Sequence, residues 1–322
     1  MRKPPRIASL LPAATETICA LGLADSLVGI SHECDHPASV RGRAVLTKSR
    51  ISPSQGGARI DRDVRRMLAQ ALSIYEVDVD ALRAAAPDVV VTQDLCEVCA
   101  VSFAQVEQAL VALGTPTVKL VRQRPTSLAD IWQSIAELGN ALGSERAARG
   151  LLRDVDARVE AVESRVPRTS ARPAVLTIEW LEPVMIGGLW MAELVALAGG
   201  TALAARPGER ARTLSLAELE QLAPDVVLVK PCGFRISQTL AERARLDAWL
   251  ARMPWPAVRN ARVWIADGNA FFNRPGPRIV DSLEILAACV HPGAFGELAV
   301  RHAGSFVRWS NSTRARSSES GA

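Results

Sequence analysis

The chain has few aromatic residues, very little lysine and no long apolar run. Aromatic side chains make up only 4% of its 322 residues, and its four lysines stand against 34 arginines scattered along the sequence. The net charge of +4 is small for this length, and no block of basic residues has aromatics between its members. Nucleic-acid binding is therefore not indicated.

Catalytic signatures are missing as well. The sequence contains no Walker-type phosphate loop, no G-x-G-x-x-G after a predicted strand, no H-E-x-x-H and no G-x-S-x-G. Two pairs of acids occur, Glu33 with Asp35 and Asp94 with Glu97, but nothing arranges either pair with a nucleophile and a base. No enzymatic activity is therefore indicated, and we predict a binding protein.

The N-terminal region does not read as a secretory signal. Residues 2–6 are basic, but the apolar run that follows is stopped by Pro12 and then by three polar residues. No apolar stretch is long enough to span a bilayer. The sequence as it stands predicts a cytoplasmic protein, in which the six cysteines stay reduced. The alternative is a periplasmic protein whose true start lies upstream.

Short β-like runs alternate with amphipathic helical stretches, which is typical of parallel α/β sheets. The segments 78–94 and 215–233 both read as a short helix, then Ala-Pro-Asp-Val-Val, then an apolar strand. This weak internal repeat predicts two Rossmann-like lobes of similar construction. We assign residues 1–125 to an N-terminal α/β lobe and residues 167–300 to a C-terminal α/β lobe. The Ser/Arg-rich residues 301–322 read as a disordered tail.

The segment 126–166 between the lobes reads as a connecting helix. Ser127 with Asp130 forms a capping-box pattern, and apolar residues then follow at helical spacing until Gly143 breaks the run. A second helical stretch continues from Ser144, and the whole is unlike a flexible linker. The predicted fold class is thus α/β, with two parallel-sheet lobes joined by a long helix.

Five motifs in this order resemble the helical-backbone family of substrate-binding proteins that serve ABC importers of cobalamin, haem and iron-siderophores. The likeness covers roughly residues 6–295. Within the family it is greatest to the cobalamin-binding branch, especially its leaderless, cytoplasmic-looking members with "SHECD" and "CEVCAVS" loops. The five motifs are "RIASLLPAATETICALGLADSLVGIS", "ALRAAAPDVVVTQD", "IAELGNALGSERAARGLL", "LSLAELEQLAPDVVLV" and "RVWIADGNAFFNRPGPRIVDSLEILA".

The resemblance implies a monomeric protein that binds a small molecule and delivers it to an ABC permease. Exported members present one acidic residue per lobe to arginines of the permease. Asp80 fills the first of these positions, but Ala217 stands at the second, with Glu218 beside it. The pair of docking acids is therefore incomplete in this sequence.

Ligands of open parallel sheets bind beyond the carboxyl ends of the strands. That rule selects loops without reference to any family. If the two lobes face each other, these loops surround one cleft. They are "SHECDHP" (31–37), "TQDLCEVC" (92–99), "EWLEP" (179–183), "KPCGF" (230–234) and "DGNAFFNRPGPR" (267–278).

Thiols and imidazoles gather in the first two of these loops. A Cys-x-x-Cys pair before a helix is typical of redox chemistry, since a helix N-terminus lowers the pKa of a thiol. Soft ligands in this combination also suit zinc or the metal of a bound chelate. Packing of small, semi-polar side chains is the third interpretation. The residues of the metal hypothesis are His32, Cys34, Cys96 and Cys99.

Aromatics are scarce, yet several lie in or beside the selected loops, where they would give a flat ligand its stacking surfaces. Because other tryptophans of the chain are expected in cores, about half of these aromatics could be core residues as well. Arg274 could meet an anionic group of a ligand, or could be a surface arginine with no partner. The candidate ligand-binding residues are Tyr75, Glu33, Asp35, Gln93, Asp94, Trp180, Trp190, Phe272, Asn273 and Arg274.

The sequence thus predicts non-enzymatic binding of a corrinoid, such as cobalamin, or of a related metal chelate, with no cofactor required. The alternative is a cytoplasmic metal-binding or thiol-redox protein on the same scaffold, with zinc as a possible ion. That protein would use the loops of His32, Cys34, Cys96 and Cys99. An enzyme that modifies a corrinoid or another small molecule is the less favoured alternative.

Overall fold

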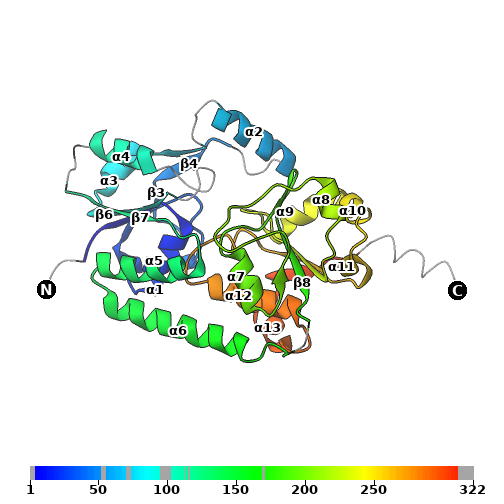
Figure 1. Cartoon of the computed structure of the whole chain (residues 1–322). Helices are drawn as coiled ribbons and strands as arrows, with labels where there is room; N and C mark the ends of the chain where they lie inside the picture. Colours follow the sequence, from blue (N-terminus) through cyan, green and yellow to red (C-terminus); the bar gives the residue numbers. More distant parts are fainter. Residues whose placement is uncertain are drawn as a thin grey trace. The chain divides into compact units, whose positions relative to one another are not determined.

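The computed structural model describes residues 4–51, 56–69, 74–94, 103–112, 114, 117–168 and 171–310. The chain divides into two compact units (Figure 1). Unit 1 comprises Met1–Ala157 together with Arg274–Pro277, and unit 2 comprises Arg158–Asn273 together with Arg278–Ala322. Each unit is described by itself below.

Unit 1 is built on a five-stranded parallel sheet. Its strands stand in the order β3-β2-β1-β6-β7, and β6 forms where the sequence predicts an apolar strand at the end of segment 78–94. A separate antiparallel pair, β4 (Thr47–Ser49) and β5 (Tyr75–Val77), lies outside this sheet. The strands of the main sheet are β1 (Ile7–Ser9), β2 (Leu27–Ile30), β3 (Ala44–Val45), β6 (Val89–Gln93) and β7 (Lys119–Gln123).

Alternate residues of the central strands supply two separate cores, one on each face of this sheet. Ile7 and Val91 pack in the cluster that contains residues of α1 (Pro12–Ala20) and α5 (Leu128–Ala141). Val90 packs in the other cluster, with residues of α3 (Val79–Ala85) and α4 (Phe103–Ala112). Figure 1 shows α1 and α5 below the sheet and α3 and α4 above it. Unit 1 also contains α2 (Gly57–Ala69) and two 3-10 turns, η1 (Ala24–Ser26) and η2 (Ala38–Val40).

The segment predicted as a connecting helix forms two helices with different roles. The predicted capping box is present: the Ser127 hydroxyl accepts from the Asp130 amide at 3.1 Å, and Asp130 accepts from the Ser127 amide at 3.0 Å. Gly143 has a φ of 70°, a left-handed conformation that glycine adopts without strain, and it separates α5 from α6 (Glu145–Glu163). Because Leu138 of α5 is buried in the core of unit 1, α6 and not α5 is the helix that passes from one unit to the other.

Unit 2 is built on a six-stranded sheet in the order β10-β8-β11-β12-β13, with β9 paired to β8. Strands 10, 8, 11 and 12 are parallel, whereas strands 9 and 13 run antiparallel to their neighbours. The strands are β8 (Ala174–Leu181), β9 (Val184–Ile186), β10 (Thr201–Ala202), β11 (Val226–Val229), β12 (Val263–Ala266) and β13 (Phe306–Arg308).

The last of these strands corrects the prediction of a tail from residue 301. Phe306–Arg308 pairs with β12, and Trp309 is buried, with its indole donating to Asp247 at 2.8 Å. Alternation along three residues is too short a pattern to separate an edge strand from a polar tail. Residues 311–322, the rest of the predicted tail, lie outside the described part of the chain.

Among the helices of unit 2, α12 is buried on nearly its whole circumference. All residues of α12 except Asp281 are buried, as expected of a helix packed on every side. Trp255 is fully buried in the main core, where its indole donates to the carbonyl of Leu219 at 2.9 Å. The helices are α7 (Met191–Leu197), α8 (Leu216–Glu220), α9 (Ile236–Ala241), α10 (Arg243–Leu250), α11 (Pro256–Arg259), α12 (Ile279–Val290) and α13 (Gly296–Arg301).

The Ala-Pro-Asp-Val-Val repeat has the same structural function in both units. In unit 1 the carboxylate of Asp88 accepts from the amide of Arg6, just before β1, at 2.8 Å. In unit 2 the carboxylate of Asp225 accepts from the amide of Ala174, the first residue of β8, at 2.9 Å. Each aspartate thus joins the start of its own strand to the start of the neighbouring parallel strand. In the described residues, no helix is both long enough and apolar enough to cross a membrane.

Candidate functional site

The loop that follows β2 in unit 1 forms a polar network at the carboxyl edge of the sheet. The Tyr75 hydroxyl donates to Glu33 at 3.0 Å, and the ring of Tyr75 lies 5.4 Å from that of His32. Nδ1 of His32 is 2.7 Å from the hydroxyl of Thr47. Burial raises the pKa of Glu33, although the hydrogen bond from Tyr75 opposes the shift, and burial lowers the pKa of His32. Three predicted site residues are therefore brought together.

Arg274 belongs to unit 1 and is paired inside it. Its guanidinium donates to Asp35 at 2.7 Å and to Glu16 at 3.0 Å, and its side chain is only 8% exposed. The segment approaches α1 closely at Gly276, where an added Cβ would lie 3.1 Å from the carbonyl oxygen of Ala13. The charge of Arg274 is thus balanced by two carboxylates of the chain itself.

The end of β6 contributes Gln93 and Asp94. Gln93 is buried, and the carboxylate of Asp94 is about half-exposed beside Arg122 at 3.5 Å and Arg124 at 3.6 Å. Cys96 and Cys99, which follow directly, lie outside the described residues. Their role as metal ligands or as a redox pair stays a prediction.

Cys34 lies inside the core of unit 1. Its side chain is buried in the core beside α1, with Sγ 3.0 Å from the hydroxyl of Thr15. Burial raises the pKa of Cys34 to about 12, so the thiol is neutral at physiological pH. Cys34 therefore suits the packing interpretation.

A buried lysine organises the corresponding edge of unit 2. Lys230 follows β11, its side chain is 0% exposed, and its ammonium donates to Glu179 at 2.9 Å and to Asn273 at 2.8 Å. The Asn273 side-chain amide in turn donates to the carbonyl of Gly268 at 2.7 Å. Both hydrogen-bonding ends of the predicted ligand residue Asn273 are thus used within the unit.

Two of the predicted stacking aromatics are core residues. Trp190 is 4% exposed and Phe272 is 1% exposed, and the Trp190 indole donates to the carbonyl of Phe272 at 2.8 Å. Trp180 is half-buried, with its ring edge-on to that of Phe234 at 5.2 Å, and its indole nitrogen is buried without a partner among the described residues. Tyr75 and Trp180 therefore remain the predicted aromatics that have exposed surface.

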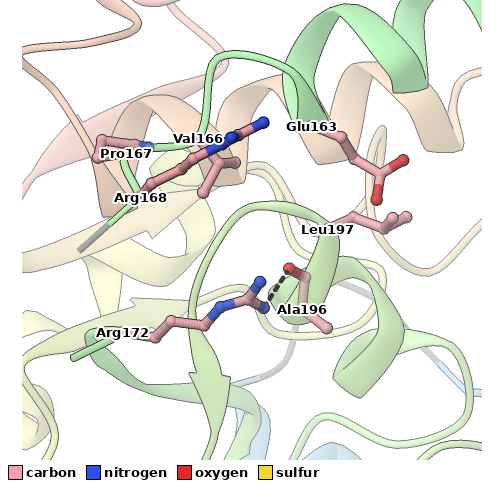
Figure 2. A pocket seen from close by; sticks show the side chains of 7 residues that line it. All are labelled: Glu163, Val166, Pro167, Arg168, Arg172, Ala196 and Leu197. Carbon is pink, nitrogen blue, oxygen red and sulfur yellow. Dashed lines mark hydrogen bonds between the residues drawn. The ribbon is translucent and has the colours of Figure 1, made fainter. Parts of the chain in front are cut away.

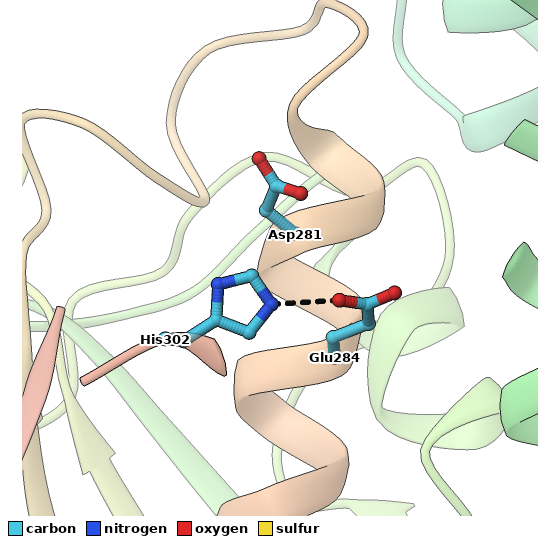
Figure 3. Close-up of side chains that lie close together, drawn as sticks. All are labelled: Asp281, Glu284 and His302. Atoms are coloured by element: carbon cyan, nitrogen blue, oxygen red, sulfur yellow. Dashed lines mark hydrogen bonds and ion pairs between the residues drawn. The ribbon is translucent and has the colours of Figure 1, made fainter. Parts of the chain in front are cut away.

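A third group of titratable side chains lies on α12 and beyond α13. Figure 3 shows the carboxylates of Asp281 and Glu284 on one helix, with the His302 ring turned toward Glu284 at 2.7 Å. Two arginines already pair with these acids: Arg158 contacts both carboxylates, and Arg301 contacts Glu284 at 3.1 Å. A metal ion would compete with two cations, so the group acts as an ion-pair network.

One pocket of about 230 Å³ lies in unit 2 (Figure 2). It adjoins the end of α6 and the last residues of α7, and Arg172 on its wall donates to the carbonyl of Ala196 at 3.3 Å. Arg172 precedes β8, so the pocket is at the amino end of that strand, opposite to the edge where ligands of such sheets bind. No predicted site residue lines it.

Sequence reasoning did not single out Lys230, Glu179 or Glu16 as site residues. A lysine immediately after the apolar run of β11 was a usable signal, because a charge at a strand end is placed at the ligand-binding edge. The partners of Lys230 are 51 and 43 residues away, and no local pattern connects them.

Comparison with known proteins agrees with this architecture. Residues 7–270 match the model of a family described as periplasmic binding protein. A cobalamin-binding protein of Halobacterium salinarum is 23% identical over 296 residues, which cover 90% of this chain and 70% of the relative.

Solved structures share the fold at low identity. A periplasmic heme binding protein from Pseudomonas aeruginosa superposes with a TM-score of 0.69 at 19% identity, over 91% of this chain and 94% of the other. The periplasmic vitamin B12 binding protein of Vibrio cholerae gives 0.64 at 18% identity, over 90% and 98%. Proteins of this kind bind solutes and are not enzymes, as the absence of catalytic motifs predicted. Because the family model matches most of the length of this chain, the chain belongs to the periplasmic binding protein family.

Proposed function

We propose that this chain is a substrate-binding protein of the ABC-importer type, with a corrinoid as its ligand. Its family binds small molecules and works with ABC permeases, and the relatives named above bind cobalamin, heme or vitamin B12. The choice among these ligands depends on the charges at the carboxyl edges of the two sheets.

The observation that carries the proposal is the pairing of two basic side chains of the strand-end loops with carboxylates. Lys230 and Arg274 are buried, and each is neutralised by carboxylates of its own unit. Arg278 lies over the ring of Phe271, 5.3 Å from its centroid. Haem carries two propionate carboxylates, which need cations that are not already paired.

Hydrogen-bond acceptors are plentiful at the carboxyl edge of each sheet. Glu33 and Glu179 are partly exposed, and Asp94 stands at the end of β6. A corrinoid such as cobalamin has a rim of amide groups, whose N–H donors match these acceptors. Carboxyl groups in these positions favour a ligand whose rim carries amide groups and disfavour a ligand whose rim carries carboxylates.

Equilibrium titration of the purified protein tests this proposal. We expect saturable changes in absorbance with cobalamin and dicyanocobinamide, and weaker or no binding of haemin. Glu33→Gln should weaken corrinoid binding several-fold, whereas Glu76→Gln, an exposed carboxylate on the same strand as Tyr75, should leave the affinity unchanged. Tighter binding of haemin than of either corrinoid, or no saturable binding of any ligand, would refute the corrinoid assignment.

The permease partner is part of the same proposal. Asp80 is exposed and pairs with Arg83 on the same helix turn. Glu218 is turned into the cap of α8, where its carboxylate accepts from the amide and the hydroxyl of Ser215, both at 2.8 Å. A permease would therefore meet Asp80 more readily than Glu218. The family is normally periplasmic, and the cytoplasmic location expected from the sequence stays a prediction.

A further inference from the structure

Lys230 is a cation without exposed surface at the edge where a ligand is expected. Its side chain is 0% exposed, and the ammonium has two acceptors, Oε2 of Glu179 at 2.9 Å and Oδ1 of Asn273 at 2.8 Å. Removing a charge from water is costly, and apolar residues of the same volume often stabilise a fold equally well. A buried ion pair therefore suggests a role in fixing geometry.

The three members of this group come from three different strand ends. Glu179 is near the end of β8, Lys230 follows β11, and Asn273 is in the loop after β12. The loops are also fastened through their backbones, because the amide of Cys232 donates to the carbonyl of Glu179 at 3.0 Å. Gly268 permits the close approach, since an added Cβ would lie 2.1 Å from the carbonyl oxygen of Pro231.

This arrangement leaves one oxygen of Glu179 available. Lys230 engages Oε2, and the structure gives Oε1 no partner among the described residues. The Glu179 side chain is 24% exposed, so Oε1 can reach solvent or a ligand while its twin is held. A carboxylate fixed in this way is an acceptor whose rotamer is already selected before a ligand arrives.

We propose that Lys230 is a positioning residue that holds Glu179 as an acceptor for amide N–H groups on the rim of the ligand. The inference rests on the proposed corrinoid function and specifies its ligand class. Glu179 accepts from primary amides and repels carboxylates, so unit 2 selects amidated corrinoids over corrinoids with acid side chains.

The test compares two corrinoids that differ in these groups: dicyanocobinamide, which has an amide rim, and cobyrinic acid, in which carboxylates replace the amides. Absorbance titrations give Kd for the full-length wild type, Glu179→Gln, Lys230→Met and the double variant. We expect each single variant to weaken dicyanocobinamide about tenfold, the loss of one charge-assisted hydrogen bond. In Glu179→Gln, which removes the negative charge, the preference for dicyanocobinamide over cobyrinic acid should also shrink.

The double variant separates a positioning role from a merely structural one. If Lys230 acts through Glu179, the double variant binds no more weakly than Glu179→Gln alone. Arg301→Met, which removes a cation from the ion-pair network around Glu284, is the control and should keep the wild-type Kd. If Lys230→Met fails to fold, Asn273→Leu removes the second hydrogen-bond acceptor of the ammonium and should also weaken binding of dicyanocobinamide.

The measurements distinguish failure of this inference from failure of the proposed function. If the wild type binds no corrinoid, both the proposed function and this inference are overturned. If the wild type binds dicyanocobinamide but Lys230→Met retains its affinity, only the positioning role is overturned. The same holds if the effects of the two single variants multiply in the double variant.

Discussion

The carboxylate of Glu284 should govern much of the acid stability of unit 2. It is 2% exposed on α12 and accepts from His302 at 2.7 Å, from Arg158 at 2.9 Å and from Arg301 at 3.1 Å. Burial alone would raise its pKa, but the hydrogen bond from His302 and the ion pairs with the two arginines lower the pKa to about 2. The prediction concerns Glu284→Gln, which keeps the shape and removes the charge.

The size of the effect on the free energy of unfolding follows from the shift in the pKa of Glu284. A drop from the ordinary value of 4.5 to about 2 corresponds to about 3 kcal/mol of stability, at 1.36 kcal/mol per unit. Because the pKa is lower in the folded state, this contribution is complete above the unfolded value of 4.5 and is lost as the pH falls toward 2. About 1 kcal/mol of it should remain at pH 3.

Urea unfolding of wild type and Glu284→Gln across this range measures the difference. We expect the gap in the free energy of unfolding to be about 3 kcal/mol at pH 7 and to narrow to about 1 kcal/mol at pH 3. Glu297→Gln is the control, since that exposed carboxylate pairs with Arg165 on the surface and its gap should be much smaller. A gap for Glu284→Gln that stays constant from pH 7 to pH 3 would show that the charge of Glu284 does not stabilise the fold.

Three further predictions concern buried groups. Trp190→Phe leaves the buried carbonyl of Phe272 unpaired and should lower the free energy of unfolding by about 1–3 kcal/mol in urea; a change below the error of the measurement would contradict this. Gly268→Ala places a Cβ 2.1 Å from the Pro231 carbonyl, so both Tm and corrinoid affinity should fall, and an unchanged Tm would mean that the loops are not packed as described. Because burial raises the pKa of Cys34 to about 12, iodoacetamide at pH 8 should label it only after denaturation, as mass spectrometry of the peptides would report; equally fast labelling of the native protein would disprove the assignment.

Local patterns allowed much of the fold to be predicted. The capping box at Ser127 and Asp130 and the break at Gly143 depend on residues close in sequence, and both features are present in the structure. The strands after both Pro-Asp pairs are confirmed too, since a run of apolar residues between a turn and a polar end has few other solutions.

The limits of prediction appear where distant residues decide the outcome. That Trp190 belongs to the core depends on its hydrogen bond to Phe272, 82 residues away. In the same way, whether Arg274 meets a ligand or the chain depends on Glu16, 258 residues earlier. Sequence spacing carries no information about contacts at such separations. The sequence can therefore place a residue in a ligand loop without identifying its partner.

The assignment of Arg274–Pro277 to unit 1 limits how the protein can be divided. The chain passes between units within α6, returns to unit 1 for four residues and then leaves again. A fragment that ends at Ala157 would retain Glu16, which is 4% exposed, without the guanidinium that neutralises it. Neither half is therefore a self-sufficient module: dissecting this molecule, exchanging its halves with those of a relative, or permuting its termini must keep this short insertion with the part that it completes.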